Sequence, residues 1–222
     1  MKKITVTIAT FLVLIGLSGV ANAYSINYIS NSNGNEFISP YTGVTTETFD
    51  PSGTKNWTWT GDYSIQNYSQ TGVAAAPYGV SVPDASYFVA VPADLSLGSQ
   101  VTVTNLGGVN ATYNYLGIWW GSVDAYNTIS FYENDVYQVS FTGVQATSPS
   151  AANGNQTVHS SNLYINFLDL PNFNSFVMSS SQYAFEADNI SVGNVSVPEP
   201  ATMLLLGLGL VGLAGARRKF KN

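Results

Sequence analysis

The sequence predicts an all-β fold, an antiparallel β-sandwich of jelly-roll type, and three observations lead to this prediction. Residues 24–196 are rich in Ser, Thr, Asn, Gly and Tyr. They show no sustained helical periodicity, whereas short runs of alternating apolar and polar residues recur along them. About nine or ten such strands, joined by turn-rich connections, are typical of two packed antiparallel sheets.

The strands are expected where the alternation is clearest. Residues 128–132 and 136–141 flank Glu133-Asn134-Asp135, whose residue types favour a tight turn, so the two runs predict a β-hairpin. Its second strand is expected to carry three residues on one face: Tyr137, Val139 and Phe141. In chain order, the other expected strands are 45–49, 57–60, 87–91, 101–104, 113–120, 163–168, 175–179 and 183–191.

The polar segment 148–160 is rich in small residues and predicts a mobile loop. It contains His159, the only histidine of the chain. A Ser-His-Asp triad needs a base that a carboxylate orients, and no recognisable motif surrounds His159. We therefore predict a solvated loop histidine, no catalytic residue and no enzymatic activity.

Charge is distributed unevenly along the chain. Residues 24–196 contain one basic residue, Lys55, and twelve acidic residues, which gives this region a formal charge of −11 against −6 for the whole chain. Such a domain repels phosphate backbones and anionic lipid surfaces, so we expect no nucleic-acid partner. The absence of cysteine excludes disulfides, thiol catalysis and cysteine-bound zinc.

The N-terminus has the three parts of a secretory signal peptide. Lys2 and Lys3 form the positive region, residues 4–20 are apolar, and Ala21 and Ala23 supply the small residues of an A-x-A cleavage site. We predict a signal peptide over residues 1–23, export through the Sec translocon, and a β-sandwich domain over residues 24–196. A retained membrane anchor is the alternative interpretation.

The C-terminus, residues 197–222, predicts a second signal. Val197-Pro198-Glu199-Pro200 precedes the uncharged run 201–216, which the basic cluster 217–221 follows, beginning with Arg217-Arg218-Lys219. A helix over 201–216 would be about 24 Å long, barely enough to span the hydrocarbon core of a membrane. By the positive-inside rule, the basic cluster stays cytoplasmic and the acidic domain lies outside. A simple tail anchor is the alternative, but it leaves the Pro-Glu-Pro sequence without a role.

This C-terminal arrangement resembles the PEP-CTERM sorting signal of Gram-negative bacteria, whose signature residues Pro198, Glu199 and Pro200 match. The resemblance implies a transient inner-membrane stage, cleavage by an exosortase and delivery to the cell surface or extracellular matrix, in association with exopolysaccharide. Two segments of the domain, 116–127 and 184–190, resemble parts of exosortase-dependent surface proteins. The second is also similar to the last strand of several carbohydrate-binding jelly rolls.

The same region holds a candidate metal site. Glu186 and Asp188 are two residues apart on an expected strand, so their side chains lie on one face. Paired carboxylates suit calcium, the candidate cofactor, and Asn189 can add to its shell. They also suit acid and base roles in glycoside cleavage. The alternative is a solvated outer face opposite Phe185 and Ala187. The same alternatives apply to three other acidic residues: Asp124, Glu133 and Asp135.

Four tryptophans form two close pairs, Trp57 with Trp59 and Trp119 with Trp120. Trp57 and Trp59 share a strand face and can form a platform for a sugar ring, whereas Trp119 and Trp120 point to opposite faces. A sugar-binding role requires at least one exposed tryptophan, and burial in the core is the alternative. The sequence thus predicts a non-enzymatic exported surface or matrix protein, with a carbohydrate-binding module and a carbohydrate-active enzyme as alternatives.

Overall fold

The computed structural model describes residues 24–29, 37–52, 55–79, 83, 85–96, 98–108, 110–196, 207–210 and 213. Several predicted features lie outside these residues: the signal peptide with Ala21 and Ala23, the motif 197–200, the cluster 217–221 and most of the run 201–216. Within the described residues, no helix is both long enough and apolar enough to cross a membrane.

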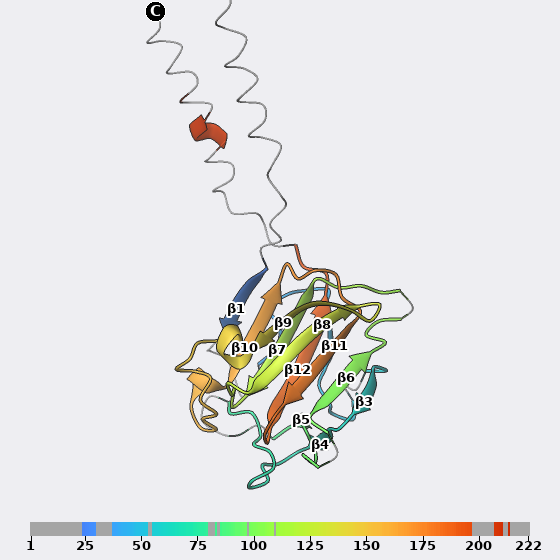
Figure 1. Ribbon diagram of the computed structural model, residues 1–222, viewed down its shortest axis with the longest axis vertical. Coiled ribbons are helices and arrows are strands. Elements are labelled where there is room, and N and C mark those ends of the chain that lie inside the picture. The colour runs from blue at the N-terminus through green and yellow to red at the C-terminus, as the bar shows by residue number, and fades with distance from the viewer. Residues whose placement is uncertain are drawn as a thin grey trace, which may run out of the picture.

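The described chain is mostly antiparallel β-structure, as predicted, and its strands form two sheets (Figure 1). The first, sheet A, has the order β1-β10-β7-β12-β5-β4, and β2 also pairs with β12. Its strands are β1 (Ser25–Ile29), β2 (Thr45–Glu47), β4 (Ser64–Gln66), β5 (Phe88–Val91), β7 (Tyr115–Gly121), β10 (Leu163–Leu168) and β12 (Phe185–Gly193). Sequence reasoning missed β1 and β4, the two outermost strands, which are short and are each paired along one side only.

The second sheet, sheet B, has the order β3-β6-β11-β8-β9. Its strands are β3 (Thr58–Gly61), β6 (Gln100–Thr104), β8 (Asn127–Glu133), β9 (Val136–Thr142) and β11 (Ser175–Ser180). From β5 to β12 the chain repeatedly crosses between the sheets, and only β8 and β9 are consecutive in one sheet. Two short helical segments lie between the strands: α2 (Gly143–Ala146) and η2 (His159–Ser161). Residues 207–210 are also helical.

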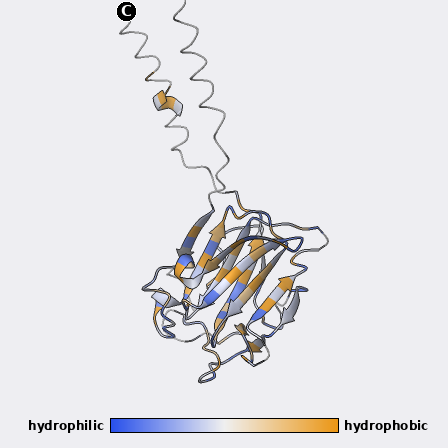
Figure 2. Ribbon diagram, in the orientation of Figure 1, coloured by the Kyte–Doolittle hydropathy of each residue, from blue (hydrophilic) through white to orange (hydrophobic). Residues whose placement is uncertain are grey.

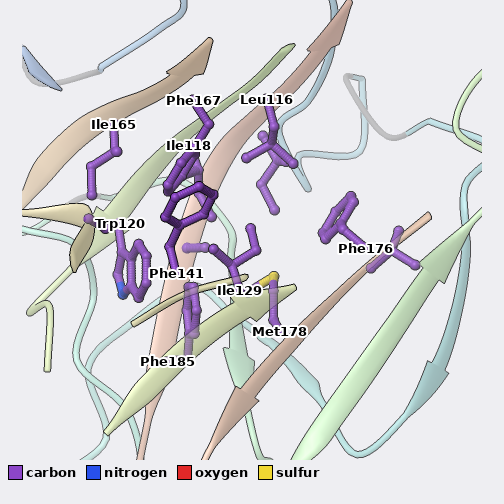
Figure 3. Close-up of a cluster of buried hydrophobic side chains, with 14 of the residues drawn as sticks. Leu116, Ile118, Trp120, Ile129, Phe141, Ile165, Phe167, Phe176, Met178 and Phe185 are labelled. Atoms are coloured by element: carbon purple, nitrogen blue, oxygen red, sulfur yellow. The ribbon is translucent and has the colours of Figure 1, made fainter. Parts of the chain in front are cut away.

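The two sheets pack face to face around one main hydrophobic core. Apolar residues of β5, β7, β10 and β12 meet apolar residues of β6, β8 and β11 there. Figure 3 shows part of this core, in which Trp120 of β7 stacks on Phe185 of β12 with 4.1 Å between ring centroids. Hydrophobic and polar residues are interspersed along the strands (Figure 2), and they alternate strictly in β6 and in most of β8, where one face of the strand is turned to this core.

The predicted hairpin is confirmed, with one correction. Strands β8 and β9 pair through a turn in which Asn134 and Asp135 both have positive φ, the backbone that a tight hairpin turn requires. The register shifts between Phe131, which faces Val139, and Tyr132, which faces Tyr137. This β-bulge turns Tyr137 to the solvent face, whereas Val139 faces the core.

Both ends of the domain emerge at one end of the sandwich. Ser25, at the start of β1, pairs with Leu168 at the end of β10, and Gly193, at the end of β12, pairs with Tyr115 at the start of β7. Because β7 and β10 are antiparallel neighbours, these four residues lie at the same end, which we name the exit end (Figure 1).

Candidate functional site

The predicted carboxylate pair lies on β12, near the end of the sandwich opposite the exit end. Glu186 and Asp188 share the outer face of sheet A, while Phe185 and Ala187 point into the core, as the alternation predicts. The outer face is not solvated, however, because Glu186 and Asp188 are 2% and 1% exposed. The segment between β4 and β5 covers them through its described residues, among them Ala75 and Ser86.

Glu186 connects this covering segment to the sheet. Its Oε1 accepts a hydrogen bond from the Ala75 backbone N–H at 2.8 Å, and its Oε2 accepts one from the Ser122 hydroxyl at 2.8 Å. Burial raises the pKa of the Glu186 carboxyl to about 8, against the lowering effect of these two donors. Glu186 therefore accepts a proton in the neutral pH range.

A pocket of about 310 Å³ opens beside Glu186. The loop 69–74, Gln156, Tyr183 and Ala184 form its other walls. Asp124 is a second carboxyl, half-buried and outside the pocket lining. Its Oδ2 accepts a 2.6 Å hydrogen bond from the Tyr126 hydroxyl, and burial raises the pKa of its carboxyl. The structure thus places Glu186 in the wall of the pocket, with Asp124 close enough that its charge also raises the pKa of Glu186.

Protein groups donate hydrogen bonds to both carboxylates. Asp188 accepts from the Asn189 backbone N–H at 2.6 Å and from the Ser86 hydroxyl at 3.1 Å. Among the residues that the structure describes, no group of three or more His, Cys, Asp or Glu side chains is positioned to hold a metal ion. Of the other acidic residues considered, Asp135 lies at the exit end, in the β8–β9 turn, and Glu133 ends β8.

Two tyrosine hydroxyls form a buried network on the outer face of sheet A, nearer the exit end. The Tyr164 hydroxyl donates to the Asn189 carbonyl at 3.1 Å and shares a hydrogen bond of 3.0 Å with the Ser191 hydroxyl, and Tyr115 donates to Asn166 Oδ1 at 2.8 Å. Gly117 lies between the two rings, where a Cβ atom would overlap both hydroxyls. Burial raises the pKa of Tyr115 to about 12, so this network remains uncharged.

The tryptophans do not form an exposed platform. Trp57 and Trp59 share a face, as predicted, but it is the inner one, where both rings contact Phe176. Trp119 and Trp120 point to opposite faces and both are fully buried. Trp120 lies in the main core, whereas Phe37 and Tyr164 cover Trp119 on the outer face of sheet A.

The predicted loop histidine is only partly exposed. His159 lies in η2, and its ring is 6.1 Å from the Tyr78 ring. The segment 148–160 packs against the loop that connects β7 to β8. Ala151 and Ala152 are buried, and the Gly154 N–H donates to the Val123 carbonyl at 2.9 Å.

Sequence reasoning missed the outer face of sheet B, where polar uncharged residues form three rows across the strands. The strand registers align the rows, and only the buried Ser175 and the apolar Val177 interrupt the exposed hydroxyl and amide side chains. We name this surface the hydroxyl face; it consists of Thr58, Thr104, Tyr132 and Tyr137, then Thr60, Thr102, Ser130 and Ser140, then Gln100, Ser179, Thr128 and Thr142. All twelve are exposed or half-exposed.

A hollow of about 250 Å³ adjoins the hydroxyl face at the exit end. Thr104 belongs to both, and asparagines supply much of the remaining lining. Asn174 Nδ2 donates to Asn134 Oδ1 at 2.8 Å, and the Asn134 N–H donates to Asn174 Oδ1 at 3.0 Å, which fixes two of these amides. The alternation of Thr and Ser with apolar residues, as in Gln100-Val101-Thr102-Val103-Thr104, is the sequence signal for such a face.

Comparison with known families identifies the C-terminal segment. The family model described as the PEP-CTERM protein-sorting motif matches residues 196–219. The match begins at Ser196, where the described domain ends at the exit end. A comparison with curated proteins gave no match.

Proposed function

We propose that this PEP-CTERM sorting-domain protein is a non-enzymatic component of the cell surface or extracellular matrix, held in association with exopolysaccharide. The sorting motif carries the proposal. It makes the chain an exported protein that transits the membrane and depends on an exosortase system. The remaining steps, which are signal-peptide removal, cleavage at the Pro-Glu-Pro sequence and the final location, belong to the proposal.

The arrangement of the domain ends supports this route. Tyr24 and Ser196 both lie at the exit end, so the predicted membrane segments on either side can reach one membrane while the sandwich stands outside it (Figure 1). Near this end, Asn114 holds Val195: Asn114 Oδ1 accepts from its N–H at 2.8 Å and Asn114 Nδ2 donates to its carbonyl at 3.2 Å. Cleavage after these contacts would leave the sandwich intact.

The strand order supports a jelly-roll assignment for the domain. The central order β5-β12-β7-β10 of sheet A stands opposite the order β6-β11-β8-β9 of sheet B. Two such four-stranded sheets, linked by repeated crossings, are the arrangement of two Greek keys in a jelly roll. In this assignment β1, β2, β3 and β4 are additions to the eight-stranded unit.

The environment of Glu186 favours a structural role over a catalytic one. Both of its oxygens accept hydrogen bonds from fixed protein donors, and one of these donors holds the covering segment in place. A catalytic acid must instead direct its proton at the substrate. We therefore propose no enzymatic activity and no obligatory cofactor, and we retain calcium only as a condition to vary in binding experiments.

Replacement of the motif prolines tests the proposal. In the native bacterium, a tagged protein with Pro198→Ala and Pro200→Ala should accumulate in the inner membrane at unprocessed mass, whereas the wild type reaches the surface or medium. Pro51→Ala, in an exposed turn, is the matched control and should be processed normally. Normal maturation of the double variant would refute exosortase-dependent delivery.

A further inference from the structure

We propose that the hydroxyl face, together with the adjoining amide-lined hollow, is a binding surface for a neutral polysaccharide chain. This inference rests on the proposed function for the source of the ligand, since it names the surface that would hold the exported protein to exopolysaccharide. It does not involve the buried carboxylates or the tryptophans.

The first argument is the repeating geometry of the face. Thr60 pairs with Thr102, and Ser130 pairs with Ser140, in one row that crosses all five strands. Neighbouring strands are about 4.8 Å apart, so the row extends about 19 Å, and the next row lies about 6.8 Å away along the strands. A hydroxyl group both donates and accepts hydrogen bonds. The face therefore offers regularly spaced partners to a ligand that itself repeats hydroxyl groups.

The second argument is charge. The domain has a formal charge of −11, yet none of the twelve residues of the hydroxyl face carries a charge. Asp135 is the one carboxylate among the residues that line the hollow. The acidic domain repels anionic polymers, while the face lacks the cations that would attract them. An uncharged polyol fits this surface better than an acidic polysaccharide.

The third argument is the aromatic pair at the edge of the face. The rings of Tyr132 and Tyr137 are 5.8 Å apart, and Tyr137 is 56% exposed because the bulge in β9 turns it outward. Tyr137 also hydrogen-bonds Ser140 at 3.0 Å, which holds its hydroxyl at the level of the middle row. An exposed ring offers an apolar surface for the C–H groups of a sugar and a polar tip for its hydroxyls.

The hollow adds fixed amide groups at one end of the rows. The Asn134 and Asn174 side chains are oriented by their mutual hydrogen bonds, so a ligand that enters the hollow meets prearranged donors and acceptors. A second protein copy would instead require an apolar centre, as protein interfaces generally have. The middle row has only Val177 as an apolar member.

Affinity electrophoresis of the mature full-length protein, purified from the native host, tests this inference. The probes are neutral hydroxyethylcellulose and laminarin, with anionic alginate as comparison, each with and without calcium. A triple variant with Thr60→Val, Thr102→Val and Ser130→Ala removes three hydroxyls from the middle row while it keeps strand-compatible side chains. The matched control removes three exposed hydroxyls elsewhere, with Ser25→Ala, Ser160→Ala and Ser181→Ala.

We expect a neutral glucan to retard the wild type and the control equally. The triple variant should bind with an apparent dissociation constant about tenfold higher, because three hydrogen bonds are lost, and Tyr137→Ala should weaken binding independently. Three results would overturn the inference: alginate alone retards the protein, neither glucan retards it, or a glucan retards the triple variant as strongly as the wild type. A change in sedimentation of the triple variant without a change in retardation would assign the face to self-association instead.

Failure of the surface and failure of the proposed function give different results. If the protein matures and reaches the cell exterior but ignores both glucans, the polysaccharide surface is wrong and the delivery route stands. If the protein binds glucan but the Pro198 and Pro200 variant matures normally, the surface stands and the delivery route is wrong.

Discussion

The outer face of sheet A is buried, whereas the outer face of sheet B is open to solvent, although both sheets contribute to the same core. The outer face of sheet A contains Trp119, Tyr164 and Glu186, all buried beneath loops, and its polar groups bond to one another. The outer face of sheet B carries Thr, Ser and Tyr side chains that are open to solvent. Polar residues on a strand can thus belong to a closed structural network or to an open binding surface.

The difference teaches where stability and binding are located in this domain. A buried hydrogen-bonded group costs free energy when its partner is removed, because the remaining group stays without water. An exposed hydroxyl is hydrated whether or not its neighbour is present. Substitutions that remove a buried partner from the outer face of sheet A should therefore reduce stability. Substitutions on the outer face of sheet B should change binding with the fold intact.

The largest expected effect is that of Trp119→Ala. The side chain is fully buried between Phe37 and Tyr164, so its removal should lower the free energy of unfolding by about 3–5 kcal/mol, as for a core aromatic residue. Urea denaturation followed by tyrosine and tryptophan fluorescence measures the change. Tyr137→Ala on the hydroxyl face should cost less than about 1 kcal/mol. Equal costs for the two variants would remove the distinction between the faces.

The next effect concerns pH. The pKa of Glu186 is about 8 in the folded protein and about 4.5 when unfolded, so between these values the folded state binds more protons. The contribution of Glu186 to stability should therefore be greatest at and below about pH 4.5, and it should fall as the pH rises from there toward 8. The raised pKa values of Asp124 and Glu47 act in the same direction.

Glu186→Gln isolates the contribution of this carboxyl, because Gln can accept from Ala75 and donate to Ser122. The variant should match the wild type at pH 4, below the pKa of the unfolded state, and exceed its unfolding free energy by about 2–4 kcal/mol at pH 8.5. Chemical denaturation at the two pH values provides the measurement. A variant that is less stable than the wild type at pH 8.5 would show that the ionised carboxylate stabilises the fold.

A smaller effect is expected for Tyr164→Phe. The hydroxyl bonds Ser191 and the Asn189 carbonyl in a buried site, and its loss should lower the unfolding free energy by about 1–2 kcal/mol. Tyr137→Phe removes a hydroxyl from the open face and is the control, with an expected change within about 0.5 kcal/mol. Thermal unfolding of both variants under one buffer condition compares them. If Tyr137→Phe were destabilised and Tyr164→Phe were not, the structural hydroxyl would be that of Tyr137, contrary to this prediction.

The smallest effect on stability is expected for Thr102→Val at the centre of the hydroxyl face. Val favours strands as strongly as Thr, and Thr102 is half-exposed, so unfolding should change by no more than about 0.5 kcal/mol. Its binding to neutral glucan should still decrease. A large loss of stability would mean that this hydroxyl has a structural role. The outer face of sheet B would then resemble the closed network of sheet A.

Much of the fold was predictable from local patterns. The alternation in residues 163–168 and 175–179 placed strands where β10 and β11 lie, and the Asn134-Asp135 turn predicted the β8–β9 hairpin. These features depend on the period of two in a strand and on turn chemistry, both of which are local. The bulge that turns Tyr137 outward could not be read in this way, because register depends on the partner strand.

The candidate sites show the same division. The sequence placed Glu186 and Asp188 on one face of a strand, and the structure agrees, but the pattern could not show that Ala75 and Ser86 cover that face. Nor could it distinguish a buried polar face from an open one, since Tyr164 and Tyr132 occupy equivalent polar positions in alternating strands. Exposure is decided by segments distant in the chain.

By itself, the sequence determined the all-β class, the acidic character of the domain and the sorting motif at residues 196–219. Each of these depends on composition or on residues adjacent in the chain. The tertiary structure alone decided that both domain ends share the exit end, that all four tryptophans are buried or half-buried, and that an uncharged hydroxyl face remains open. The physical reason is that strand pairing and loop coverage join residues far apart in sequence, and these contacts determine which polar groups meet water.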